Sequence, residues 1–192
     1  MKILDFFTIL WYNKSTKMEV IMMDSREFFR KILVKVFSAD TSFDAEGWSP
    51  QNPTYGHCAV ATLVIDDFCN AKDKKIAKIK VNGVSHYFNV IDGNVVDMTA
   101  EQFGLENVLN YSEMEFSTRE YLLSNENTLK RYKTLKKRFE DFYYDKCYSC
   151  DDCGDRHFWE DIVWITSSYG LCKTCRDKLS DEEVEKLEEK YE

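Results

Sequence analysis

The sequence AKIKVNGVSHYFNVIDGNVVDMT, residues 77–99, consists of three runs of alternating apolar and polar residues separated by Asn82-Gly83 and Asp92-Gly93. A period of two is typical of β-strands, and Asn-Gly or Asp-Gly between two such runs is a strong signal for a two-residue turn. We therefore predict two successive antiparallel hairpins, with strands over residues 77–81, 84–91 and 94–99.

Two-residue turns also determine which residues face each other, because each turn allows one register. The first turn places Ile79 opposite His86, and the second places Phe88 opposite Asp97. His86 and Asp97 then lie diagonally on one face, within reach of each other's side chains. Because this face is the apolar one, we expect it to pack on the core, covered by the helix that begins at Cys58.

Residues 58–69 are apolar nearly all round, which predicts a helix buried in the middle of the domain. Cys58 stands at its start, where unpaired backbone N–H groups favour a thiolate, whereas Cys69 stands at the opposite end, where the helix dipole disfavours one. A buried carboxylate beside His86 would fix its tautomer and let the imidazole accept the thiol proton. We therefore predict a catalytic triad of Cys58, His86 and Asp97, although taken singly Cys58 and His86 could be core residues and Asp97 a turn or cap residue before Thr99.

The rest of the pattern predicts a mixed α+β domain. Apolar residues at helical spacing predict helices from about residue 25 to 37 and from 128 to 144. Thr99 with Gln102 has the spacing of a capping box, which predicts another helix start. Residues 38–56 lack periodicity and contain both prolines, so we expect a long loop, and long loops in compact domains are often functional.

The composition limits the class of protein. Of 192 residues, 44% are apolar, and glycine and proline are scarce, so the chain can bury a large core. Lys and Arg total 26 against 34 Asp and Glu, and the net charge of -8 argues against nucleic acid as a partner. No apolar run is long enough to cross a membrane, and residues 1–12 are not followed by a secretory cleavage site. Met18, Met22 and Met23 leave the start open, so we treat residues 1–23 as an uncertain N-terminal extension.

Five of the seven cysteines lie between Cys147 and Cys175. Cys150-x2-Cys153 and Cys172-x2-Cys175 have the spacing of one tetrahedral Zn²⁺ held by four thiolates, a closed site with a structural role. Cys147-x2-Cys150 is an alternative pair, but Gly154 favours Cys150 with Cys153 because it relieves the turn behind the second ligand. This cysteine usage indicates a reducing compartment, so we expect a cytoplasmic protein.

Nearly all of the net negative charge lies in residues 147–192, where the composition changes. We therefore predict an α+β domain over residues 1–146 and a zinc-binding module over residues 147–192 that ends in an acidic helix and resembles a treble-clef or ribbon-like module. A module this short buries little apolar area by itself, so the metal is expected to hold its fold together. The acidic helix favours a protein partner over DNA, with a solvated helix face as the alternative.

Several blocks of the first domain, in order along the chain, resemble the YunG-like family. They are Ser38 to Ser42, Trp48 to Pro53, Gly56 to Val60, Ser85 to Asn89, Asp97 to Thr99 with Gln102 and Phe103, and Arg131 and Tyr132 with Leu135. The resemblance covers about residues 25–140 and implies a fold more than an activity.

The family's order of a cysteine on a helix followed by a histidine and an aspartate on strands is similar to that of papain-like and transglutaminase-like thiol enzymes. By that resemblance, Asn52, six positions before Cys58, is a candidate oxyanion donor. His57 departs from the family, which usually has glutamine there, and would have to replace it as a donor. Trp48 and Tyr55 are candidates for lining the substrate cleft, with anchoring of the loop as the alternative.

Together these patterns predict a papain-like α+β domain that acts as a cysteine hydrolase or acyltransferase on an amide in a protein or peptide, with Zn²⁺ as a structural cofactor of the tail. The alternative is a catalytically inactive papain-like scaffold whose zinc module binds a protein partner. The sequence identifies neither the substrate nor the oligomeric state.

Overall fold

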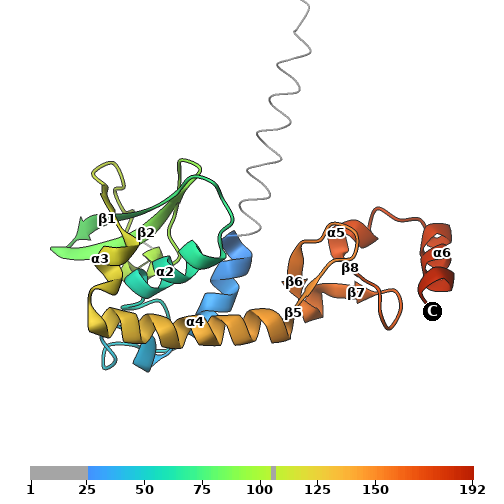
Figure 1. Ribbon diagram of the computed structural model, residues 1–192, viewed down its shortest axis with the longest axis horizontal. Coiled ribbons are helices and arrows are strands. Elements are labelled where there is room, and N and C mark those ends of the chain that lie inside the picture. Colours follow the sequence, from blue (N-terminus) through green and yellow to red (C-terminus); the bar gives the residue numbers. More distant parts are fainter. Residues whose placement is uncertain (1–25, 105–106) are drawn as a thin grey trace, which may run out of the picture. The chain divides into compact units, whose positions relative to one another are not determined.

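The computed structural model describes residues 26–104 and 107–192, which divide into two compact units (Figure 1). One unit ends at Phe139, and the other comprises Glu140–Glu192. The division lies within helix α4 (Glu126–Lys146), a few residues before the change in composition. The uncertain N-terminal extension, residues 1–23, lies outside the described residues. Within the described ranges, no helix is long and apolar enough to cross a membrane.

The first unit contains a four-stranded antiparallel sheet in the order β3-β2-β1-β4. Its strands are β1 (Lys74–Val81), β2 (Val84–Ile91), β3 (Asn94–Val96) and β4 (Glu115–Ser117). Both hairpins have the predicted register, with Ile79 opposite His86 and Val90 opposite Val95. Asn82 and Asp92 have positive φ, as two-residue turns of this kind require.

The third strand ends earlier than predicted, at Val96. Asp97 accepts a hydrogen bond from the backbone N–H of Thr99 through Oδ1 at 2.9 Å. Aspartate side chains that bond to the backbone two residues on favour a turn over a continuing strand. A short 3-10 helix, η2 (Ala100–Phe103), follows at once.

Helix α2 (Cys58–Phe68) is the predicted buried helix and packs against β2 (Figure 1). It contacts the face opposite to the one we expected: Asn89, which alternates with His86 and Phe88, donates to the backbone oxygen of Thr62 at 3.2 Å. The face that carries Phe88 is covered instead by residues of the segment 107–114. The prediction was wrong because the later half of β2 is buried on both faces, so periodicity alone could not choose between them.

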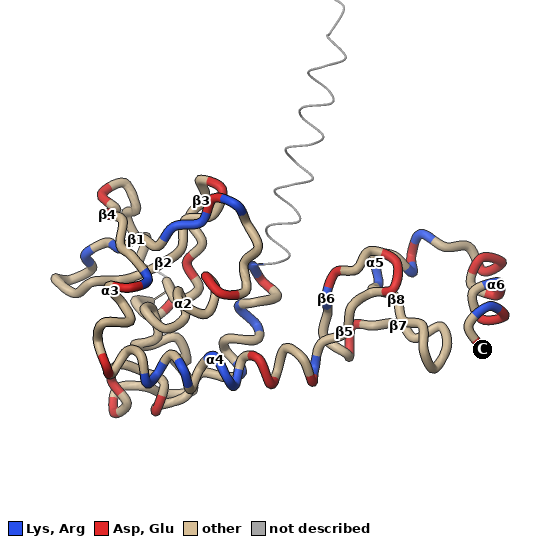
Figure 2. Tube along the Cα trace, viewed as in Figure 1, with Lys and Arg blue, Asp and Glu red and all other residues tan. Residues whose placement is uncertain are grey.

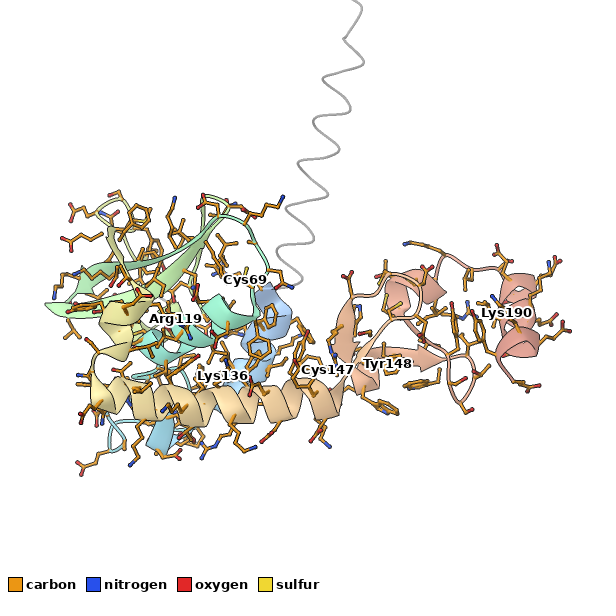
Figure 3. The ribbon with its side chains drawn as sticks, viewed as in Figure 1. Cys69, Arg119, Lys136, Cys147, Tyr148 and Lys190 are labelled. Carbon is orange, nitrogen blue, oxygen red and sulfur yellow. The ribbon has the colours of Figure 1, made fainter. Side chains whose placement is uncertain are left out.

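The first unit also contains a helix over residues 26–36, the short helices η1 (Ala39–Thr41) and α3 (Arg119–Leu123), and the first part of α4, which extends beyond its predicted range at both ends. The ring of Phe139 from α4 meets Phe29 and Phe68, with centroids 6.0 and 4.6 Å apart. At the C-terminal end of α2, Asp67 pairs with Arg119 of α3 at 2.8 Å and with Lys136 at 2.9 Å. Figure 3 labels the two cations, Arg119 and Lys136. These cations compensate a carboxylate at the end of a helix where the dipole disfavours it.

The second unit consists of two small hairpins and two helices. They are β5 (Cys147–Ser149) with β6 (Arg156–Phe158), the 3-10 helix η3 (Trp159–Asp161), β7 (Ile162–Trp164) with β8 (Gly170–Cys172), α5 (Lys173–Arg176) and α6 (Asp181–Tyr191). Its buried cluster consists of three cysteines and Leu171, and Leu187 of α6 packs against it. Acidic residues recur along α6 (Figure 2).

Candidate active site and metal centre

His86 and Asp97 meet in the buried interior of the first unit. The ring Nε2 of His86 lies 2.5 Å from Oδ2 of Asp97, and both side chains are almost fully inaccessible to solvent. The hairpin register brings the two chain segments together, and the turn at Thr99 holds Oδ1 of the carboxylate. Tyr111 donates its hydroxyl to Oδ2 at 2.9 Å, so both oxygens of Asp97 have partners.

Cys58 lies at the first position of α2 and is partly exposed. Its thiol is close enough to His86 to act on the pKa of the ring. Burial disfavours the imidazolium, but the hydrogen bonds from Asp97 and Cys58, together with their negative charges, outweigh it and raise the pKa of His86 to about 9. Asp97 occupies Nε2 of the ring, which leaves Nδ1 for other partners. The three predicted residues therefore lie together.

Gln102 is a site residue that the sequence reasoning missed. Its Nε2 donates to the backbone oxygen of Thr99 at 2.9 Å and lies 3.2 Å from Nδ1 of His86. Its Oε1 accepts from the N–H of Gly56 at 3.3 Å, just before Cys58. Gln102 thereby links the loop that leads into α2 to the imidazole. Its spacing from Thr99 suggested a cap, yet η2 has no side-chain cap, and the side chain reaches His86 instead.

The other four predicted residues have different surroundings. Asn52 donates to the backbone oxygen of Gln102 at 3.2 Å and so lies beside the site. Trp48 donates to the carbonyl of Pro53 at 3.1 Å, and the hydroxyl of Tyr55 donates to Asp44 at 3.3 Å. Both aromatic side chains are half-buried and anchor the loop.

His57 points into the core. Its side chain is fully buried, its Nε2 lies 2.9 Å from Oγ1 of Thr41, and its ring packs on Phe37 with centroids 4.1 Å apart. Burial, which the surrounding backbone oxygens oppose only in part, lowers the pKa of His57 to about 4. The neutral imidazole of His57 is enclosed in the core beside the start of α2, and no part of it reaches solvent.

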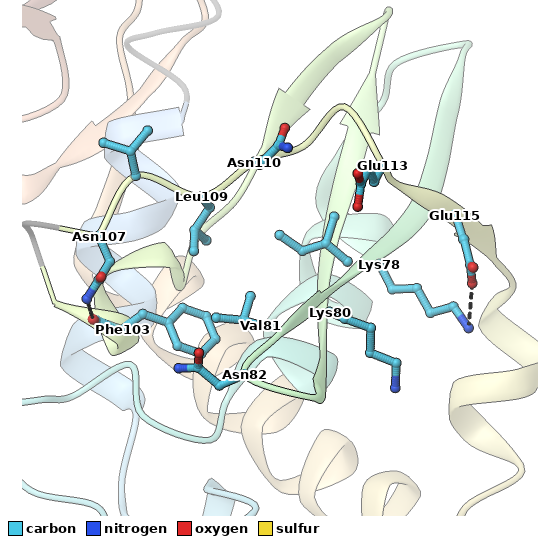
Figure 4. Close-up of a pocket in the computed structure, with 12 residues that line it drawn as sticks. Lys78, Lys80, Val81, Asn82, Phe103, Asn107, Leu109, Asn110, Glu113 and Glu115 are labelled. Atoms are coloured by element: carbon cyan, nitrogen blue, oxygen red, sulfur yellow. Dashed lines mark hydrogen bonds and ion pairs between the residues drawn. The ribbon is translucent and has the colours of Figure 1, made fainter.

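A cavity of about 430 Å³ lies along β1 and the segment 107–115 (Figure 4). Phe103, in its wall, meets the His86 ring edge-on with centroids 5.0 Å apart, and Ile79, also in the wall, lies opposite His86 on the neighbouring strand. The rim carries charges, including the ion pair of Lys78 with Glu115 at 3.2 Å. Two of the residues that line this cavity are therefore neighbours of His86.

Four cysteines of the second unit converge at one point. The sulfur atoms of Cys150, Cys153, Cys172 and Cys175 all lie within 4.8 Å of one another, and those of Cys153 and Cys172 are 4.0 Å apart. Four sulfurs at about 2.3 Å from a tetrahedral Zn²⁺ are separated by roughly 3.8 Å, so the cluster has the size of such a site. The donor set therefore fits one thiophilic metal ion.

The local backbone brings the first pair of sulfurs together. Gly154 has a φ of 77° and donates its N–H to the carbonyl of Cys150 at 2.9 Å, which closes a tight turn behind Cys153. Burial opposes ionisation of Cys150, but backbone N–H groups of residues 152, 153 and 172 outweigh it and lower its pKa to about 7. The alternative ligand Cys147 lies outside the cluster, in β5 opposite Phe158, and burial raises its pKa to about 11.

Comparison with known proteins shows which family the first unit resembles. The family described as YunG protein matches residues 25–144, which is more than half of the chain. The chain belongs to the YunG family. A relative, the uncharacterized protein YunG of Bacillus subtilis (strain 168), is 33% identical over 93 residues, which cover 48% of this chain and 74% of the relative. No solved structure matches the chain.

The YunG region contains Cys58, His86, Asp97 and Gln102, so all the side chains around the imidazole belong to the part that the family defines. The cysteine cluster begins at Cys150, beyond the end of that region. The candidate active site is thus a feature of the YunG unit, and the candidate metal centre is a feature of the tail that follows it.

Proposed function

We propose that the YunG unit is a papain-like thiol hydrolase or acyltransferase that acts on an amide in a protein or peptide. The observation that carries the proposal is the position of His86, which is hydrogen-bonded to the buried carboxylate of Asp97 and lies near the partly exposed Cys58, whose thiol acts on the pKa of the ring. A carboxylate that orients an imidazole beside a thiol is the arrangement that nucleophilic thiol catalysis requires.

In the proposed reaction, His86 holds the proton of the Cys58 thiol, and the sulfur attacks the carbonyl carbon of the substrate. The carbon–nitrogen bond then breaks, and His86 delivers the proton to the leaving amine, which leaves a thioester on Cys58. Water or a second amine attacks the thioester, returns a proton through His86 and releases the thiol. Asp97 keeps the ring oriented throughout.

The negative charge on the carbonyl oxygen needs hydrogen-bond donors during the attack. The first-turn N–H groups of α2 have no partner inside the helix, and they lie beside Cys58. We assign them this role. Asn52, held through Gln102, is a second donor near the site, whereas the enclosed side chain of His57 plays no part. The cavity walled by Phe103 and Ile79 is where we place the substrate chain.

A chromogenic ester tests the acyl transfer itself. With p-nitrophenyl acetate, the wild-type chain should release nitrophenol and gain one acetyl group, located on Cys58 by peptide mass spectrometry. Cys58→Ser should abolish that adduct, and His86→Ala should slow its formation by about a hundredfold or more, as expected for loss of a general base. Acetylation spread evenly over the cysteines, or unaffected by His86→Ala, would favour the inactive scaffold.

For the tail, we propose a structural Zn²⁺ held by Cys150, Cys153, Cys172 and Cys175. Such a metal would hold the two hairpins together. With four thiolate ligands it would have no open coordination position for a substrate. We further propose a cytoplasmic location and a protein or peptide partner, which all seven free cysteines and the acidic α6 support.

A further inference from the structure

Arg131 is a buried cation that the proposed reaction has not yet used. It lies on α4, and only 6% of its surface is exposed. Its Nη1 donates to the backbone oxygens of Thr41 at 3.2 Å and Gly56 at 3.5 Å, and its Nε donates to the side chain of Asn127 at 2.7 Å. All of these acceptors are neutral.

Two other arginines in the first unit have carboxylate partners. Arg119 pairs with Asp67 at 2.8 Å, and Arg138, two turns along the same helix as Arg131, pairs with Asp40 at 2.8 Å. Within the described ranges, no ion pair joins Arg131 to an aspartate or a glutamate. Burying a cation without a countercharge is costly, so a negative group is expected close to it.

Cys58 is a group whose negative charge acts on Arg131. Gly56, whose carbonyl Arg131 contacts, lies two residues before it, so the guanidinium is held at the start of α2. Burial lowers the pKa of Arg131, and the negative charge of Cys58 opposes that effect. The other titratable groups that act with Cys58 are His86 and Tyr87, both from β2.

We propose that Arg131 is the buried countercharge of the Cys58 thiolate and acts as a positioning residue for it. The inference rests on the proposed function, because it concerns the same sulfur. In each cycle His86 gives its proton to the leaving amine and becomes neutral, whereas a guanidinium stays charged at every accessible pH. Arg131 would therefore provide the sulfur with a positive charge that does not change as His86 gains and loses its proton during the cycle.

The pH dependence of Cys58 alkylation by iodoacetamide tests this role, since a purely structural residue would not move it. The rate at Cys58 is followed in the full chain by peptide mass spectrometry between pH 5 and 10. Arg131→Gln should move the midpoint of the rate profile upward by about one to three pH units, the usual effect of losing a nearby opposite charge. Arg131→Lys, which retains a cation, should give a smaller shift.

Arg138→Gln is the matched control, because Arg138 lies on the same helix and binds the same 38–41 segment but pairs with Asp40. Arg138→Gln should leave the midpoint of the Cys58 rate profile unchanged. A folded Arg131→Gln protein with the wild-type midpoint overturns the inference. If Cys58 is no more reactive than Cys69 in the wild type, the proposed function itself fails, and the two failures are thereby distinguished.

A second measurement leaves Arg131 in place, in case its replacement unfolds the chain. In the His86→Ala background, the melting temperature is compared with and without Cys58→Ser across the same pH range. A thiolate paired with Arg131 adds stability as pH rises, so the difference between the two proteins should grow with pH. A difference that stays constant would show that Arg131 does not hold the thiolate.

Discussion

At the scale of single residues, His86 and His57 are both fully buried, yet their surroundings drive their protonation in opposite directions. Burial disfavours the charge on each ring. For His86 the hydrogen bonds and negative charges of Asp97 and Cys58 outweigh burial, whereas the partners of His57 do not. The ring at the candidate active site is therefore charged at neutral pH, and the core ring is neutral.

The raised pKa of His86 predicts a loss of stability at alkaline pH. The folded chain holds the proton up to about pH 9, whereas the unfolded chain releases it near 6.5. The folded state therefore binds more protons between these values, and the free energy of unfolding falls as pH rises through the window, by on the order of 3 kcal/mol. Urea unfolding at several pH values should show this slope in the wild type. His86→Asn should flatten it, and an equally steep slope in that variant would contradict the assignment.

The lowered pKa of His57 predicts acid sensitivity of the opposite sign. Between about pH 6.5 and 4 the unfolded chain binds a proton that the folded chain excludes, so stability is lost as pH falls through that window. His57→Gln, a neutral residue at every pH, should retain more of its neutral-pH stability at pH 4.5 than the wild type does. Thermal melts at pH 7 and 4.5 measure the difference, and equal losses in both proteins would refute the prediction.

At the scale of elements, the hairpins were predictable because their turn residues and alternation are local. The register that follows from the two turns is enough to bring His86 and Asp97 side by side. The side of the sheet that α2 covers could not be predicted, because neighbouring residues such as Phe88 and Asn89 are both buried. The role of Gln102 was hidden for a similar reason, since its contacts with Gly56 and His86 are long-range and its sequence neighbours suggested only a cap.

The link made by Gln102 predicts a moderate effect on reactivity. Gln102→Ala removes the side chain that lies 3.2 Å from Nδ1 of His86 and accepts from the N–H of Gly56, so the imidazole and the start of α2 lose their common partner. Loss of one net hydrogen bond of about 1 kcal/mol should lower the rate of Cys58 acylation roughly fivefold. The rate of ester turnover measures this decrease. Glu101→Ala on the same short helix is the control. Equal rates for the two variants would argue against a role of Gln102 in linking His86 to Gly56.

At the scale of the whole molecule, the chain joins a YunG unit to a tail whose buried cluster consists largely of cysteine. The tail has little apolar area of its own, so its order should depend on the metal. The spacing of its cysteines predicted the four that converge, because two short pairs are positioned by local turns. The division within α4 was not predictable from composition, since a continuous helix carries no signal at that point.

Metal analysis and chelation test the role of the tail. Purified chain should contain about one Zn²⁺, lost in Cys150→Ser with Cys172→Ser and retained in Cys147→Ser. Treatment with a strong chelator should expose residues 140–192 to proteolysis while the YunG unit stays resistant. A metal-free chain whose tail resists protease as well as the untreated protein does would contradict the structural role.

The reactivity of Cys58 relative to Cys69 within one chain tests the central claim most directly. Both thiols are partly exposed and lie at opposite ends of α2, so each serves as the other's reference. At pH 7, iodoacetamide should alkylate Cys58 at least tenfold faster than Cys69, and His86→Ala should remove that advantage. Equal rates at the two cysteines in the wild-type chain would contradict an activated thiol at this site.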